Sequence, residues 1–172
     1  EKMRDFFDAR SEGYDEHMQG AMDAFEGFYA ALARPIPRTE AALRILDIGC
    51  GTGLELDPIL QRVPNAQITG VDLSARMLAR LRAKYADCGG QMTLIQGSYL
   101  DLPLGEARYD WAVSAMTLHH LLPERKGRLY ARIRRALKPG GRYVEGDYVV
   151  SPEKAAQRLA AYREKMAAGE GL

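Results

Sequence analysis

Short apolar runs alternate with amphipathic stretches along most of this 172-residue chain. Five runs are predicted to be strands, and they cover residues 43–49, 67–73, 92–97, 109–116 and 142–150. The first is nearly continuous and apolar, as is typical of a strand buried on both sides of a sheet. The stretches between and after them have the apolar spacing and the end signals of helices, at 54–63, from Ser74 to Tyr85, at 123–141 and from about 152 to about 168. This order predicts an α/β fold with a doubly wound, mostly parallel sheet and right-handed crossovers.

The N-terminal part carries a separate helical pattern that ends at the sequence "RPIPR". After Tyr14, apolar residues recur every three or four positions, at Met18, Met22, Phe25, Phe28 and Leu32. This spacing places them on one face, so we expect a helix here, although two internal glycines lower its intrinsic stability.

Composition limits the number of domains and the classes of partner. With 172 residues, 47% of them hydrophobic, the chain can bury one sizeable core. Its 24 basic and 23 acidic side chains give a formal charge of +1, so no global field favours nucleic acid. Four basic residues lie opposite the apolar positions of their helix, and we interpret them as a solvated face: Arg125, Arg128, Arg132 and Arg135.

Targeting and metal signals are lacking in the sequence. It contains no run of about eighteen apolar residues, and its first ten residues lack the apolar core of a signal peptide. We therefore expect a cytoplasmic protein without a membrane partner. Cys50 and Cys88 have no companion Cys or His at metal-ligand spacing, which predicts reduced, structural thiols and no metal site.

The sequence "ILDIGCGTG", residues 45–53, stands where the first expected strand ends and the next helix begins. Ligands of open α/β sheets bind outside the carboxyl ends of the strands, near the switch in strand order. Glycines at this point allow a tight turn, a close approach of backbone to ligand, and free N–H groups at the start of a helix. The pattern therefore predicts a turn that binds a small ligand.

Two acids narrow the choice of ligand. A dinucleotide turn has the pattern G-x-G-x-x-G, whose third glycine would fall where this chain has Leu54. Asp47, directly before the glycines, would repel a pyrophosphate but suits an ammonium group. Asp72 ends the second strand after Gly53 at the distance where an acid binds the two hydroxyls of a ribose. A nucleoside with an amino-acid tail, S-adenosylmethionine, satisfies both acids.

Five segments, in order and in register, resemble the class I, Rossmann-like S-adenosylmethionine-dependent methyltransferases, in particular the group that acts on small molecules. They are "LDIGCGTG" (46–53), "VDLSARML" (71–78), "GSYLDLP" (97–103), "YDWAVSAMTLHHL" (109–121) and "LKPGG" (137–141). The resemblance covers about residues 43 to 150. It implies one methyltransferase domain over 1–172, with an N-terminal helical lid at about 1–40, a cofactor-binding core at about 41–150 and a C-terminal helix at about 151–172.

The same resemblance implies which residues hold S-adenosyl-L-methionine and its product S-adenosyl-L-homocysteine. Asp47 would lie near the ammonium group and Asp72 would bind the ribose. Ser98, with the backbone of Tyr99, would accept a hydrogen bond from the adenine amino group, where the family often has an aspartate. Asp101 we interpret as a solvated turn residue. The other cofactor-binding positions are Gly49, Cys50, Gly51 and Gly53 around the methionine part and Leu73 and Met77 beside the adenine. Ser114 on the fourth expected strand is the last cofactor-binding position.

Methyl transfer needs alignment and exclusion of water, and it needs a base only where the acceptor arrives protonated. His119 and His120 follow the fourth strand at the rim where the acceptor approaches, so each is a candidate for that base. In "EGDY", strand alternation places Glu145 and Asp147 on one face, where an acid would orient a cationic acceptor. Tyr14 matches a segment that covers the cofactor in the family, and it completes the catalytic candidates His119, His120, Tyr14 and Asp147.

These motifs leave the acceptor open. We expect a small molecule; the alternatives are different chemistry on the same cofactor and a catalytically silent cofactor-binding subunit. The family's sheet usually ends in an antiparallel hairpin beside the fifth strand, which the residues after 150 do not offer. Since natural proteins cover such edges, we expect either further chain beyond Leu172 or a homodimer through the open edge at 142–150.

Overall fold

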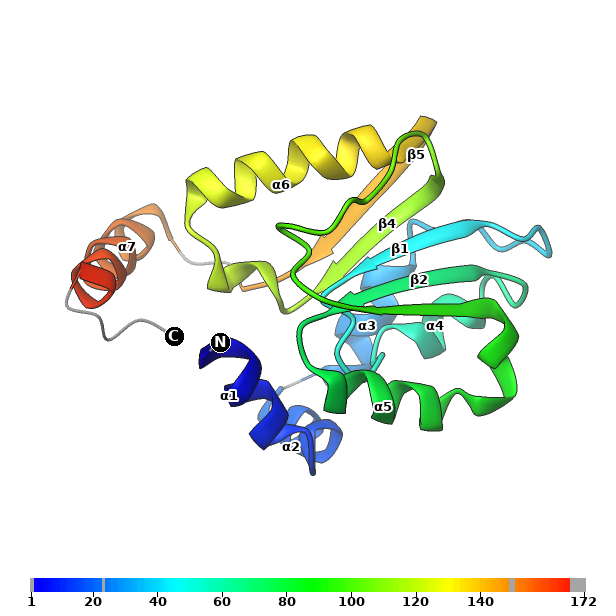
Figure 1. The fold of residues 1–172 in the computed structure, drawn as a ribbon, viewed down its shortest axis with the longest axis horizontal. Helices are drawn as coiled ribbons and strands as arrows, with labels where there is room; N and C mark the ends of the chain where they lie inside the picture. Colours follow the sequence, from blue (N-terminus) through cyan, green and yellow to red (C-terminus); the bar gives the residue numbers. More distant parts are fainter. Residues whose placement is uncertain (1, 23, 149–150, 168–172) are drawn as a thin grey trace.

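The computed structural model describes residues 2–22, 24–148 and 151–167 (Figure 1). Three helices open the chain: α1 (Lys2–Arg10), α2 (Tyr14–Ala21) and α3 (Phe25–Ala33). Strands and helices then alternate as β1 (Arg44–Ile48), α4 (Leu56–Leu60), β2 (Gln67–Asp72), α5 (Ala75–Lys84), β3 (Met92–Gln96), β4 (Tyr109–Ala115), α6 (Pro123–Ala136) and β5 (Leu137–Gly146). Short 3-10 segments follow α5 and β4, at η1 (Ala86–Gln91) and η2 (Leu118–His120), and the last helix is α7 (Pro152–Ala167).

The five strands are parallel and lie in the order β3-β2-β1-β4-β5. The order reverses between β1 and β4, so the carboxyl ends of these strands form the point where ligands bind in such sheets. Figure 1 shows α6 on one face of the sheet and α3, α4 and α5 on the other. The predicted doubly wound α/β fold is confirmed.

Each face of the sheet carries an apolar core, as the side chains of β1 illustrate. Ile45 belongs to the core on the side of α4 and α5, whereas Leu46 and Ile48 belong to the core beneath α6. Burial of such side chains contributes roughly 1.5–3 kcal/mol each. Asp47 is also buried in this strand, but it is polar. Burial of its carboxyl group costs free energy unless a partner compensates it.

The helical pattern after Tyr14 is interrupted. α2 ends at Ala21 and α3 begins at Phe25, with Ala24 in the left-handed region at φ +63°. Both helices bury one face, so the apolar spacing continues across the break. The sequence pattern therefore does not reveal the break. The sequence pattern does not predict α1.

The boundary between α6 and β5 also differs from the prediction. α6 ends at Ala136, five residues before the predicted end, and β5 starts at once with Leu137. The sequence Pro-Gly-Gly (139–141) lies inside β5, where the register with β4 shifts. A Cβ at Gly141 would lie 2.9–3.2 Å from three backbone oxygens, so this glycine permits strand pairing rather than ending a helix. Positions 149 and 150 of the predicted strand lie outside the described residues.

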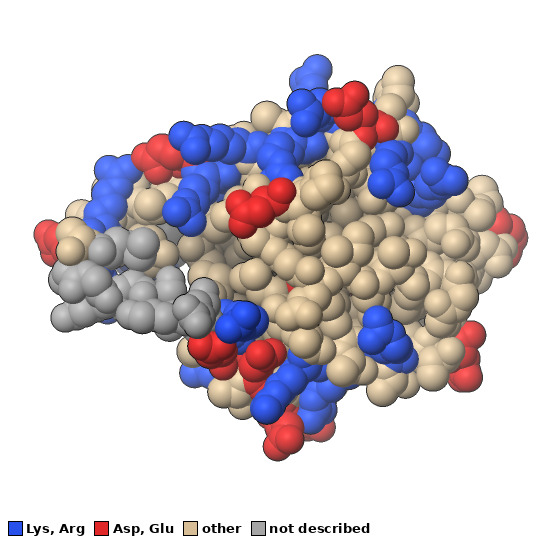
Figure 2. All heavy atoms as spheres, viewed as in Figure 1, with Lys and Arg blue, Asp and Glu red and all other residues tan. Residues whose placement is uncertain are grey.

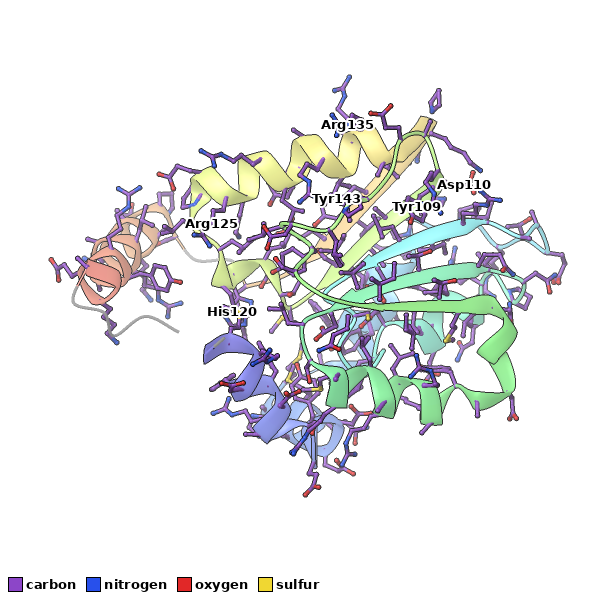
Figure 3. All side chains as sticks on the ribbon, viewed as in Figure 1. Tyr109, Asp110, His120, Arg125, Arg135 and Tyr143 are labelled. Atoms are coloured by element: carbon purple, nitrogen blue, oxygen red, sulfur yellow. The ribbon has the colours of Figure 1, made fainter. Side chains whose placement is uncertain are left out.

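The basic residues of α6 lie mostly on the outside. Figure 2 shows Lys and Arg gathered along the edge that α6 forms, and Figure 3 labels Arg125 and Arg135 near its two ends. Arg135 Nε lies 3.3 Å from Glu106 Oε1, with both side chains about 70% exposed, so this is a solvated surface pair. Arg132 differs, because it is half-buried and turns toward the loop after β3.

α7 agrees with the helix predicted from about 152. Figure 1 shows it set apart from the sheet, near the start of α6, where Arg163 Nη2 lies 2.6 Å from Glu124 Oε1. Through the described part of the chain, no helix is both long and apolar enough to cross a membrane. β3 and β5 are the edges of the described sheet, and pairing of β5 with a further strand stays a prediction.

Candidate functional site

Three glycines of the turn between β1 and α4 adopt backbone angles that other residues rarely adopt. Their φ angles are +70° at Gly49, +49° at Gly51 and +75° at Gly53. A Cβ at Gly49 would collide with the side chain of Thr117, and one at Gly53 would meet packed side chains 3.0–3.1 Å away. At Gly51 no atom lies within 4 Å of that position. The turn is therefore packed against the protein at two glycines and open at the third.

Four N–H groups of this turn are hydrogen-bonded within the protein. Gly49 and Cys50 donate to the carbonyl of Val71 at 2.8 and 3.2 Å, and Gly53 donates to the carbonyl of Cys50 at 2.8 Å. Gly51 donates to a carboxylate oxygen of Asp72 at 2.9 Å. In addition, α4 begins only at Leu56 and has five residues, fewer than the predicted 54–63. These four N–H groups are therefore engaged within the protein, whereas those of Thr52, Leu54 and Glu55 have no backbone acceptor among the described residues. The expectation of free N–H groups at the helix start stays a prediction for these three.

Two acids beside the turn are buried. Asp47 is 0% exposed and Glu55 is 4% exposed. Both carboxylate oxygens of Asp47, and Oε1 of Glu55, lack a hydrogen-bond partner among the described residues. Burial raises the pKa of Asp47 well above its usual range, and the neighbouring Glu55 raises it further; burial also raises the pKa of Glu55. Such a pair fits a ligand that supplies a cation and hydrogen-bond donors, as an ammonium group does.

Glu55 is a site residue that the sequence analysis misses. Its signal is an acid placed between Leu54 and Leu56, directly after the glycines, in a segment that is otherwise apolar. Within the predicted helix at 54–63, which has mixed character, an acid at this position does not indicate a binding site. Only the fold shows that it is buried with Asp47.

Asp72 joins the glycine turn to the start of α5. One of its carboxylate oxygens accepts from Gly51 N–H at 2.9 Å and the other from Ser74 N–H at 2.8 Å. Burial raises the pKa of Asp72, and these two hydrogen bonds partly offset that effect. Each oxygen keeps a further lone pair, so this carboxylate can still accept hydrogen bonds from two ligand hydroxyls.

Beyond Asp72, the loop after β3 contains the predicted adenine contacts. The Ser98 hydroxyl accepts from Leu100 N–H at 3.1 Å, and the ring of Tyr99 is buried, with its hydroxyl near Thr117. Leu73 is half-buried, whereas Met77 is 1% exposed and its N–H donates to the capping hydroxyl of Ser74 at 3.0 Å.

Arg132 of α6 holds this loop in place. Its guanidinium donates to the carbonyl of Tyr99 at 2.7 Å and also to the carbonyls of Leu100 and Leu102. Interpreting Arg132 as part of a solvated face is therefore wrong. The spacing on α6 could not show this, because the loop that accepts these hydrogen bonds lies about thirty residues earlier in the chain.

Two predicted residues lie away from the turn. The hydroxyls of Ser114 on β4 and Tyr143 on β5 are 2.7 Å apart, on the side of the sheet that α6 covers. Glu145 lies on that side as well, where its carboxylate accepts from the hydroxyls of Tyr130 at 2.8 Å and Tyr143 at 3.2 Å. Glu145 and Asp147 therefore do not share a face as predicted, because β5 ends at Gly146 and alternation ends with it.

His119 and Asp147 form a close pair at the rim. The Nδ1 atom of His119 lies 2.7 Å from one carboxylate oxygen of Asp147, and the backbone N–H of His119 donates to the other at 2.9 Å. Burial acts to raise the pKa of Asp147, but these hydrogen bonds outweigh it and leave the pKa below its usual range. Asp147 thus stays ionised and orients the imidazole, so that Nε2 is the nitrogen left to accept a proton.

A pocket of about 560 Å³ opens beside this pair, between α1, α2 and the segments that follow β4 and β5. Seven of the thirteen residues that line it carry rings: Phe6, Phe7, Tyr14, His17, His119, His120 and Tyr148. Figure 3 shows His120 next to the start of α1. Burial and the neighbouring His119 lower the pKa of His120 to about 4, and burial with the charge of Glu55 raises that of Tyr14 to about 12. At neutral pH, His120 is therefore a weak base and Tyr14 a hydrogen-bond donor.

The first two helices are fastened to the loops around the turn. The hydroxyl of Thr52 donates to Asp15 of α2 at 2.5 Å, and Lys84 Nζ lies 3.1 Å from the same carboxylate. On α1, Asp8 accepts from the hydroxyl of Ser74, next to Asp72. α1 and α2 thus cover the carboxyl ends of β1 and β2.

Known proteins with similar sequences are methyltransferases. A family model described as a methyltransferase domain matches residues 45–141. An uncharacterized methyltransferase of Geobacillus sp. (strain WCH70) is 28% identical over 158 residues, which cover 92% of this chain and 70% of that protein. The O-methyltransferase cnsE of Penicillium expansum is 35% identical over 123 residues, or 70% of this chain and 44% of that one.

A solved structure that resembles this chain is also a methyltransferase. The S-adenosylmethionine-dependent methyltransferase from Mesorhizobium loti is 34% identical, with a TM-score of 0.57 over 67% of this chain and 50% of that one. This chain thus spans half or less of the Penicillium and Mesorhizobium proteins. The match over more than half of its residues, together with the sheet order and the glycine turn, shows that the chain belongs to the class I, Rossmann-like S-adenosylmethionine-dependent methyltransferases.

Proposed function

We propose that this chain binds S-adenosylmethionine across the carboxyl ends of β1 and β2 and transfers its methyl group to a small molecule in the ring-lined pocket. The observation that carries the proposal is the shared border of the two sites. Tyr14 and Met116 line the pocket, and Thr117, next to Met116, packs against Gly49 of the turn. An acceptor in the pocket would therefore lie beside a ligand bound at the turn.

The residues around the turn fit the methionine part of this cofactor. Asp47 and Glu55 would face its ammonium group, which compensates carboxylates that otherwise lack partners. Because a cation favours the ionised form of both acids, binding should release a proton at neutral pH. The open side of Gly51 allows close approach of backbone to ligand, with Gly49, Cys50 and Gly53 forming the rest of the turn.

The nucleoside part would extend from Asp72 toward the loop after β3. Asp72 would accept hydrogen bonds from the ribose hydroxyls, with Leu73 and Met77 beside the adenine. Ser98 and the backbone of Tyr99 would contact the adenine edge, held there by Arg132. Ser114 has no part in this arrangement, because its hydroxyl is occupied by Tyr143. When bound, the cofactor supplies a methyl group activated by its sulfonium centre.

His119 is the residue best placed to receive a proton from the acceptor. Asp147 fixes its ring from the Nδ1 side, whereas His120 and Tyr14 are poorly suited because of their shifted pKa values. Asp147 acts through His119 and is a positioning residue. Tyr14 would donate a hydrogen bond at the border between cofactor and acceptor. The name of the Penicillium relative, an O-methyltransferase, supports a small-molecule acceptor.

Mass spectrometry of products tests this function. With isotope-labelled S-adenosylmethionine and a metabolite extract, the wild type should transfer the label to a small molecule. His119→Asn should lower kcat roughly 10²–10⁴-fold, the usual contribution of a general base, and leave the affinity for S-adenosylhomocysteine unchanged. Tight cofactor binding without transfer to any compound would instead indicate a silent cofactor-binding subunit.

A further inference from the structure

The walls of the pocket form a continuous band of rings. Phe6 and Phe7 of α1 meet edge to face with centroids 5.3 Å apart, and Phe7 meets His120 at 5.6 Å. His120 packs against His119 at 3.9 Å, and His119 meets Tyr148 at 5.1 Å. Aromatic rings bind other rings by offset and edge contacts, so such walls favour a flat aromatic ligand over a puckered aliphatic one.

The size and position of this band are set by the fold. The pocket volume of about 560 Å³ lies within the range of roughly 300–1,000 Å³ that drug-sized ligands occupy, enough for two or three fused rings. α1, which carries Phe6 and Phe7, is fastened beside Asp72 through Asp8 and Ser74. The band therefore faces the same end of the sheet as the glycine turn.

The charges around the pocket favour a neutral acceptor. Among the described residues that line it, Glu12 is the single carboxylate, and the guanidinium of Arg10 lies 4.0 Å from the centre of the Phe6 ring. Asp147 is shielded behind His119, with its side chain 8% exposed. Glu145, the acid expected to orient a cation, faces α6 instead. Among the described lining residues, the pocket therefore offers a cationic acceptor one carboxylate, that of Glu12, and ring faces of which the Phe6 ring is already paired with Arg10.

The pair of His119 and Asp147 adds a requirement for an acceptor that carries a removable proton. An aromatic hydroxyl, with a reference pKa near that of tyrosine at about 10, gives up its proton far more readily than an alkyl hydroxyl, which resembles water at about 15.7. An imidazole base is matched to the first of these and poorly matched to the second.

From these features we infer that the acceptor is a planar aromatic compound of two or three fused rings with a hydroxyl group directed at His119. The inference rests on the proposed function and adds the chemical class of its acceptor. The acceptor oxygen forms a bond to the methyl carbon while the carbon–sulfur bond breaks, and the electron pair of that bond stays on sulfur as a neutral thioether. The hydroxyl proton passes to Nε2 of His119 and then to water.

Three compounds built on the same fused two-ring framework separate the features: 2-naphthol, 2-(aminomethyl)naphthalene and decahydro-2-naphthol. Their binding is measured by ligand-observed NMR on the full chain with saturating S-adenosylhomocysteine, so the readout does not depend on turnover. We expect 2-naphthol to bind roughly tenfold more tightly than either other compound. With labelled S-adenosylmethionine, it alone should be methylated.

A matched pair of variants tests the ring band itself. Phe7→Leu keeps an apolar side chain but removes a ring from the pocket, and should weaken 2-naphthol binding roughly fivefold while the affinity for S-adenosylhomocysteine stays unchanged. Phe25→Leu removes a ring outside the pocket, where Phe25 packs against Tyr29 at 4.9 Å. This control should bind 2-naphthol as the wild type does.

The outcomes separate this inference from the proposed function. If decahydro-2-naphthol binds as well as 2-naphthol, if the amine is methylated in preference, or if none of the compounds binds, the acceptor class is wrong. If 2-naphthol binds in the pocket without being methylated, the acceptor class is likewise wrong. If S-adenosylhomocysteine does not bind, or if no compound of the metabolite extract accepts the label, the proposed function itself is overturned.

Discussion

At the scale of single residues, Asp47 is the side chain that local packing explains least. It lies in the middle of an apolar strand, fully buried, with no hydrogen-bond partner for its carboxylate among the described residues. Burial and the nearby Glu55 raise its pKa in the folded protein. A folded-state pKa above the unfolded value means that stability falls as pH rises past about 3.9. Asp47 therefore destabilises the free protein at neutral pH, and a bound cation would relieve that cost.

Asp47→Asn should reveal this conflict between stability and binding. Because the amide carries no charge, the variant should melt at a higher temperature than the wild type at neutral pH, by roughly 2–4 °C for each kcal/mol gained in a domain of this size. Its affinity for S-adenosylhomocysteine should fall about tenfold or more. Thermal melts and calorimetry measure both, with the exposed Asp87→Asn as control. A variant that melts lower and binds normally would contradict the assignment.

His120 predicts a pH dependence of stability. Its pKa is about 4 in the folded protein against 6.5 in the unfolded chain, so the unfolded chain takes up a proton first as the pH falls. The contribution of neutral His120 is thus present above about pH 6.5 and is lost progressively toward pH 4. After a discount for partial exposure, we expect a loss of about 1 kcal/mol between pH 7.5 and 5. Denaturant melts of His120→Gln should show a smaller loss; an equal loss would refute this.

At the scale of elements, α6 contributes to the cofactor site without touching the glycine turn. Arg132 spans from this helix to the carbonyls of the loop after β3, which contains Ser98 and Tyr99. The loop is otherwise held by turn hydrogen bonds of its own and by Gly97 N–H, which donates to the carbonyl of Asp72. The helix therefore helps to fix where the proposed adenine contacts lie. Arg132 is a positioning residue in the proposed site.

Arg132→Met should weaken S-adenosylhomocysteine binding severalfold, because methionine keeps an apolar stem but cannot donate to the three carbonyls. S-inosylhomocysteine, which lacks the adenine amino group, provides the readout that a general loss of stability would not move. We expect its affinity to change less than that of the adenosyl compound in calorimetry. Arg135→Met, near the C-terminal end of α6 with its side chain 70% exposed, is the control. Equal losses for both ligands would leave Arg132 with a structural role alone.

At the scale of the whole molecule, the middle of the sheet could be predicted because β1, β2 and β4 are mostly buried. Their continuous apolar runs at 43–49 and 67–73 contain β1 and β2 almost without error. The boundary at Ala136 could not be predicted, since Pro-Gly-Gly has the composition of a helix stop and acts here inside a strand. The break at Ala24 was hidden because two helices share one burial pattern.

Residues of the candidate site could be proposed from the sequence where an acid interrupts or ends an apolar run. Asp47 and Asp72 stand out because each ends or interrupts an apolar run, and the structure brings Asp72 to the glycine turn. Glu55 and Arg132 depend on burial and on long-range hydrogen bonds, which periodicity does not report. The sequence pattern also does not show that the N–H groups of Gly49, Cys50 and Gly51 are bonded, because their acceptors, Val71 and Asp72, lie on β2.

The central claim is that S-adenosylmethionine binds across β1 and β2 with its ribose on Asp72, and titration calorimetry with S-adenosylhomocysteine tests it most directly. Asp72→Asn keeps one acceptor but loses the charge that strengthens two ribose hydrogen bonds, each worth about 1.5–3 kcal/mol. With circular dichroism showing a folded variant, we expect affinity to fall at least tenfold, and NAD to give no binding heat with either protein. A folded Asp72→Asn that binds S-adenosylhomocysteine as tightly as the wild type would contradict the account.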